Sequence, residues 1–251
     1  LYRVEQKNTS QLEFIALMAA LMSVTALAID ALLPALDIIA FDLGILLQAD
    51  NQLLVTMIFI GLGLGPLLFG PLSDAIGRKP SVYIGFSVFL LASVVCIQAT
   101  SLELMILGRI LQGIGLSAPR TICIAIIRDL YHGDYMARIM SFVTILFLLI
   151  PIVAPAMGKY ILDNGNWKGI FYVQGVIGIF VTIWFWIRQK ETLVQTKRIP
   201  FKFNRIIQGA KQTLSHTRSI GFTLISGLIV GSFLVYLSAS QHIFQQQYGL
   251  K

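Results

Sequence analysis

Two charged residues lie inside long apolar runs of this sequence, where an isolated charge is costly. Asp30 lies six residues before Leu36, at the end of the first apolar run, and Arg109 lies six residues after Glu103, which precedes the fourth run. If the runs are helices, each charge lies about 9 Å along the helix axis from Leu36 or from Glu103, so the two charges lie at about the same depth. A carboxylate there can exchange a proton and attract a guanidinium. We predict a buried pair of opposite charges with a functional role, with a purely structural ion pair as the alternative; whether the two side chains touch stays open.

A second set of charges lies in a short loop that reads Gly70-Pro-Leu-Ser-Asp74-Ala-Ile-Gly77-Arg78-Lys79. Glycine at both ends permits a tight turn. The acid is followed four and five residues later by two bases, which can interlock across that turn. An ordinary basic turn is the alternative interpretation of the same residues.

The elements that carry these charges belong in a membrane, because the composition excludes a water-soluble globule. The chain has 251 residues, of which 56% are hydrophobic and 12% are charged, and its mean hydropathy is +0.79. An average soluble domain is about 25% charged. Disorder is excluded by the 16 Phe and the long aliphatic runs. Cys96 and Cys123 both lie inside apolar runs, so no disulfide framework is expected.

Seven stretches are long enough for spanning helices, which need about 20 mostly apolar residues. They are residues 12–36, 52–72, 80–99, 104–127, 139–160, 169–187 and 219–244. Glycines inside these runs, such as Gly61, Gly63, Gly65, Gly113 and Gly115, indicate close helix packing and not a nucleotide loop. We therefore expect an all-α, polytopic membrane protein.

The basic residues are concentrated on one side of these stretches. With the N-terminus in the cytoplasm, fourteen of the 19 Lys and Arg lie in inner loops, whereas the outer loops carry mostly acids. This asymmetry follows the positive-inside rule and predicts a cytoplasmic N-terminus. Orientation explains the net charge of +7, so no nucleic-acid partner is expected.

The longest connection divides the chain into three segments. Residues 1–187 are expected to form a six-helix transmembrane bundle, and residues 188–218 a basic cytoplasmic linker with a short amphipathic helix near 201–214. Residues 219–251 are interpreted as the first helix of a second bundle, so we read the chain as an N-terminal fragment.

The loop of Gly70 to Lys79 resembles the G-x-L-x-D-x-x-G-R-K signature of the major facilitator superfamily. Arg109-Ile-Leu-Gln112-Gly113-Ile-Gly115 is similar to the R-x-x-Q-G-x-G element of its drug/proton antiporters. The segment from Asp30 through Pro34 to Leu36 resembles the D-x-x-L-P-A-L start of the bicyclomycin/chloramphenicol-resistance (Bcr/CflA) type.

The resemblance implies a role for each matched residue. It assigns the proton-coupling and substrate cavity to Asp30, Arg109 and Gln112. It assigns a conformational latch to Gly70, Asp74, Gly77, Arg78, Lys79 and Asp129, the last in the matching segment Arg128-Asp129-Leu-Tyr131. Pro34, Pro151, Pro155 and Gly158 are expected to act as helix hinges, with a simple proline kink as the alternative for the last three. The implied fold is a bundle built as a 3+3 inverted repeat.

The resemblance implies a proton-coupled multidrug efflux antiporter of a bacterial-type inner membrane, working by alternating access. The expected partners are protons, the lipid bilayer and small, largely apolar drug-like substrates. No enzyme activity, metal or cofactor is expected, since the proton gradient supplies the energy. A carrier for a metabolite or polyamine is the alternative. A seven-helix receptor or an intramembrane enzyme is disfavoured, because residues 219–250 contain no lysine for retinal and no G-x-S-x-G pentapeptide occurs.

Overall fold

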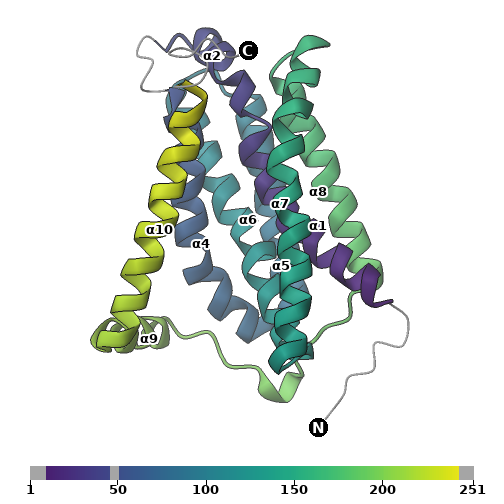
Figure 1. The fold of residues 1–251 in the computed structure, drawn as a ribbon, viewed down its shortest axis with the longest axis vertical. Helices are drawn as coiled ribbons and strands as arrows, with labels where there is room; N and C mark the ends of the chain where they lie inside the picture. The colour runs from purple at the N-terminus through teal and green to yellow at the C-terminus, as the bar shows by residue number, and fades with distance from the viewer. Residues whose placement is uncertain (1–9, 46–50, 243–251) are drawn as a thin grey trace. The chain divides into compact units, whose positions relative to one another are not determined.

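The computed structural model describes residues 10–45 and 51–242, which fold into helices with no strand in those ranges. In chain order the elements are α1 (Gln11–Asp30), η1 (Leu33–Ala35), α2 (Leu36–Asp42), α4 (Leu53–Ile76), α5 (Arg78–Ile97), α6 (Leu102–Leu130), α7 (Gly133–Asp163), α8 (Lys168–Arg188), η2 (Gln195–Lys197), α9 (Phe203–Ser215) and α10 (Thr217–His242). Figure 1 shows the long helices from α1 to α8 running alongside one another.

Six helices in the described part of the chain are long and apolar enough to cross a membrane. They are α1 with its continuation to Asp42, α4, α5, α6, α7 and α8. The all-helical membrane fold is therefore confirmed. The seventh predicted stretch corresponds to α10, a helix of 26 residues. Helices extend past their apolar runs, because the backbone ladder continues into polar ends: α7 begins six residues before its predicted start.

The first membrane-spanning segment is interrupted before its end. α1 ends at Asp30, a single 3-10 turn follows, and the chain continues as α2. Pro34 explains the interruption, since proline has no N–H to donate to the carbonyl of Asp30, four residues earlier. The break leaves the last carbonyls of α1 without their usual helical donors.

Close helix packing in the bundle depends on glycine. A Cβ on Gly113 of α6 would lie 2.1 Å from the carbonyl oxygen of Ile58 on α4, and one on Gly61 would lie 2.1 Å from the carbonyl oxygen of Ile110. Gly65 of α4 and Gly115 of α6 meet neighbouring helices in the same way, so the packing interpretation of these glycines is confirmed. Gly63 is different, because a Cβ at that position would meet nothing within 4 Å. α6 thus sits at the centre of the bundle, against α1, α4, α5 and α7.

The chain forms two compact units, Leu1–Pro200 and Phe201–Lys251. The first unit includes the beginning of the predicted linker, which packs against the bundle through Glu191 and Thr192. The second unit contains α9 and α10, and α9 lies where the sequence predicts an amphipathic helix. The three-segment division and the place of α9 on a membrane surface stay predictions.

Candidate functional site: two polar clusters in the helix bundle

The side chain of Arg109 is fully buried, and backbone carbonyls hold it instead of a carboxylate. Its Nε donates to the carbonyl oxygen of Leu54 at 2.7 Å, and its Nη1 donates to the carbonyl oxygen of Ala28 at 3.1 Å. Ala28 is among the last residues of α1, and Leu54 is in the first turn of α4. Arg109 therefore joins α6 to the broken end of α1, where a cation is favoured by the helix dipole.

Asp30 lies at that same end of α1 but does not pair with Arg109. Its side chain is 5% exposed, and its carboxylate makes no hydrogen bond or ion pair with another described residue. An ionised carboxylate is doubly disfavoured here, because it is buried and because it adds to the negative end of the helix dipole. The two residues lie in the same region, as the sequence predicts. Arg109, however, donates its hydrogen bonds to backbone carbonyls and not to Asp30.

Gln112 extends the Arg109 cluster through α6 towards α5. Its Oε1 accepts a hydrogen bond from Nη1 of Arg109 at 2.9 Å, and its Nε2 donates to Oγ of Ser93 at 2.8 Å. Gln174 of α8, also fully buried, donates to the carbonyl oxygen of Leu27 at 3.4 Å. Sequence reasoning did not single out Ser93 or Gln174. Gln174 could have been noticed in the sequence, because it is a polar residue inside the apolar run of α8.

Gly158 of α7 packs against the interruption after α1. A Cβ at this position would lie 2.0 Å from the carbonyl oxygen of Ala31 and 3.1 Å from Cγ of Pro34. Two of the four predicted hinge residues are thus in contact. Pro151 and Pro155 lie inside α7, which continues as one helix through both.

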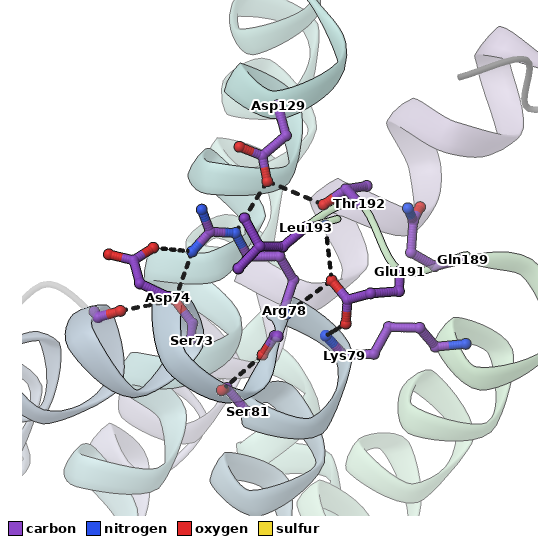
Figure 2. Close-up of polar contacts among 12 residues, drawn as sticks. Ser73, Asp74, Arg78, Lys79, Ser81, Asp129, Gln189, Glu191, Thr192 and Leu193 are labelled. Carbon is purple, nitrogen blue, oxygen red and sulfur yellow. Dashed lines mark hydrogen bonds and ion pairs between the residues drawn. The ribbon is translucent and has the colours of Figure 1, made fainter. Parts of the chain in front are cut away.

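Arg78 is the centre of the second cluster, which Figure 2 shows at the turn between α4 and α5. Its Nη1 donates to Oδ1 of Asp74 at 2.6 Å and to Oγ of Ser73 at 2.8 Å, and its Nε donates to Oδ2 of Asp129 at 3.0 Å. Gly77, with φ +115°, makes the turn that places Arg78 at the start of α5. The structure thus brings together the predicted residues Asp74, Arg78 and Asp129 from three helices.

Lys79 and Gly70 lie at the edge of this second cluster. Nζ of Lys79 donates to the carbonyl oxygen of Trp186 at 3.1 Å, so its side chain contacts α8, while its backbone N–H donates to Glu191. Gly70 accepts a hydrogen bond from Ser73 through its carbonyl, and the space around its Cα is open.

Glu191 is the cluster residue that sequence reasoning missed. Its Oε1 accepts from the backbone N–H of Arg78 at 2.9 Å, and its Oε2 accepts from the backbone N–H of Lys79 at 3.0 Å. These are unpaired donors of the first turn of α5, so Glu191 caps that helix. Thr192, the next residue, donates to Asp129 at 3.0 Å. Glu191 is the single acid between residues 188 and 218, which was the available signal.

Neither cluster resembles a metal centre. Among the described residues there is no group of three or more His, Cys, Asp or Glu side chains that could hold a metal ion. The acids of the second cluster instead bind a guanidinium and backbone N–H groups.

Residues 16–251 match the family described as Major Facilitator Superfamily. The chain is 32% identical to an uncharacterized MFS-type transporter, YdgK, of Bacillus subtilis, over 97% of this chain and 60% of the relative. It is 28% identical to a bicyclomycin resistance protein homolog of Haemophilus influenzae, over 98% and 61%, and 27% identical to the multidrug resistance protein MdtL of Salmonella typhi, over 92% and 58%. The chain spans about three fifths of the length of these relatives.

Two solved structures share the fold. The human organic anion transporter MFSD10 superimposes with a TM-score of 0.63 at 16% identity, over 79% of this chain and 53% of that one. A peptide transporter, POT, superimposes with a TM-score of 0.59 at 14% identity, over 90% and 45%.

Proposed function

Because the chain belongs to the Major Facilitator Superfamily, a family of transporters and not enzymes, we propose that it forms part of a proton-coupled drug exporter that works by alternating access. The relatives named for bicyclomycin and multidrug resistance support drug-like substrates. The distribution of basic residues supports an inner-membrane protein with a cytoplasmic N-terminus.

The observation that carries the proton coupling is the isolated carboxylate of Asp30. It is buried at the broken end of α1 without a partner among the described residues. Binding a proton removes both the cost of burying its charge and its repulsion from the α1 carbonyls. Asp30 is therefore the group whose protonation changes the energy of this region most.

Arg109 gives that protonation a structural consequence. Its Nη2 is buried and has no hydrogen-bond partner among the described residues, while Nε and Nη1 are bound to carbonyls. When Asp30 is ionised, it competes with these carbonyls for the guanidinium. When Asp30 is protonated, Arg109 stays on the end of α1. The two arrangements differ at the junction of α1, α4 and α6, where Gly158 of α7 also contacts the break.

The cluster around Arg78 serves as the latch at the opposite end of α4. Its hydrogen bonds join α4, α5 and α6 in one arrangement, and Glu191 adds the segment after α8. Opening and closing of the transporter on this side would require these bonds to form and break together. Energetically, a shared guanidinium favours such two-state behaviour over gradual movement.

The test is transport by the full-length protein in proteoliposomes with an imposed pH gradient and radiolabelled chloramphenicol. We expect Asp30→Asn to lose uphill export and to keep downhill exchange, because the permanently neutral side chain cannot couple to the gradient. Asp163→Asn is the matched control, since Asp163 is an exposed acid at the end of α7. Uphill export by Asp30→Asn at the wild-type rate would refute the coupling role.

A further inference from the structure

A polar crevice between α4 and α6 contains two cations, Arg120 and Arg128, that neither cluster uses. The cavity has a volume of about 570 Å³. Its α6 wall is a single helix face with Ser117, Arg120, Thr121, Ile124 and Arg128. A cavity of roughly 300–1,000 Å³ is the size that binds small organic molecules.

The crevice begins at the level where the two helices are in close contact and extends to the Arg78 cluster. They are in backbone contact at Gly61 and Gly113, and Gly65 still contacts Ser117 one turn further. Beyond that level, Gly70 of α4 lines the crevice, and a Cβ there would meet nothing within 4 Å. Arg120 of α6 lies on the wall of this cavity, so its guanidinium has room to meet a ligand.

Arg120 is an exposed cation within a membrane-spanning helix. It lies ten residues before Leu130, about 15 Å from that end of α6. It makes no ion pair or hydrogen bond with any residue that the structure describes. A charge at such depth is costly unless it faces water or binds a counter-charge, and the hydroxyl side chains beside it indicate a polar surface.

The acids of the crevice do not neutralise Arg120. Asp74 and Asp129 both bind Arg78, and Asp129 lies nine residues away, about 13 Å along α6. The charged residues that line the crevice are three arginines and two aspartates, so the surface carries a net positive charge. The unbound cations are Arg120 and Arg128.

We propose that this crevice binds the anionic group, such as a carboxylate, of an amphiphilic organic substrate through Arg120, with the hydroxyl of Thr121 as a second donor. A guanidinium suits a carboxylate because it donates two parallel hydrogen bonds. This inference rests on the proposed transport function and narrows its substrates to molecules that include organic anions.

The experiment compares nalidixic acid with its ethyl ester, which lacks the charge, by calorimetric titration of the full-length protein in lipid nanodiscs at pH 8. We expect wild type to bind the acid about tenfold or more tightly than the ester, as for a charged hydrogen bond. Arg120→Gln should remove that preference and keep ester binding, which also shows that the variant is folded. Arg120→Lys should keep part of the preference. Arg138→Gln, which removes an exposed cation of α7 outside the crevice, should match wild type.

The inference is overturned if wild type binds acid and ester equally or binds neither, or if Arg120→Gln keeps the preference for the acid. Export of chloramphenicol driven by a pH gradient is measured on the same preparations. If export occurs without a preference for the acid, the anion site is wrong and the transport function stands. If the preference occurs without export, the anion site stands and the transport function is wrong.

Discussion

Glu191 caps α5 through the backbone of Arg78, at a distance of 2.9 Å between Oε1 and the amide nitrogen, across 113 residues of sequence. The same carboxylate also receives the N–H of Lys79. A residue after the last helix of the bundle thereby stabilises the first turn of its third membrane-spanning helix. The start of the predicted linker is for this reason part of the bundle.

Replacing Glu191 by Ala should lower the free energy of unfolding by about 1–2 kcal/mol, the cost of losing an N-terminal cap. The thermal unfolding midpoint of the full-length protein in detergent measures this. Lys190→Ala, at the neighbouring exposed residue, is the control and should leave the midpoint unchanged. Equal midpoints for both variants would contradict the capping role.

Asp129→Asn should destabilise the protein more than Asp74→Asn, although both acids bind Arg78. The Asp129 side chain is 25% exposed and also accepts from Thr192, whereas the Asp74 side chain is 46% exposed and its ion pair is better screened. We expect a loss of about 1–2 kcal/mol for Asp129→Asn and less than about 1 kcal/mol for Asp74→Asn. Chemical denaturation of the two variants gives the comparison, and the opposite order would rule out this account.

Gly158→Ala should be destabilising, because its Cβ would lie 2.0 Å from the carbonyl oxygen of Ala31 and would push α7 away from the break in α1. Such overpacking costs about 1–3 kcal/mol. Gly63→Ala is the matched control, since nothing lies within 4 Å of its new methyl group, and it should stabilise α4 by about 0.5–1 kcal/mol. Unfolding midpoints that move in the same direction for both variants would show that Gly158 is not constrained by the contact.

The helices and the Arg78 cluster could be predicted because their determinants are local. Apolar runs of membrane thickness define spans, and Asp74, Gly77 and Arg78 lie within about one turn of each other in sequence. Asp129 followed from its family resemblance. Glu191 could not be placed in the same way, because the loop that returns it to α5 leaves no periodic pattern in the sequence.

The partners of Arg109 could not be predicted, for a different physical reason. Opposite charges at equal depth favour an ion pair, and Asp30 was the natural candidate. Backbone carbonyls have no sequence signature, and those of α1 become available only because the helix is interrupted before Pro34. The position of Pro34 predicts the interruption of the helix. That the freed carbonyls bind Arg109 could be seen only once the positions of three helices were known.

The contact between Gly61 and Gly113 also sets the geometry of any relative tilt of α4 and α6. The backbones touch at this level, and Gly65 meets Ser117 one turn further, so the helices have no room to approach there and we expect any tilt to pivot about this region. Arg120 is seven residues, about 10 Å, beyond it. A tilt of about 10° about the pivot would move the guanidinium level by about 2 Å, while the two glycines stay in contact. Small rotations would thus change the width of the crevice without disturbing the packing that holds the helices together.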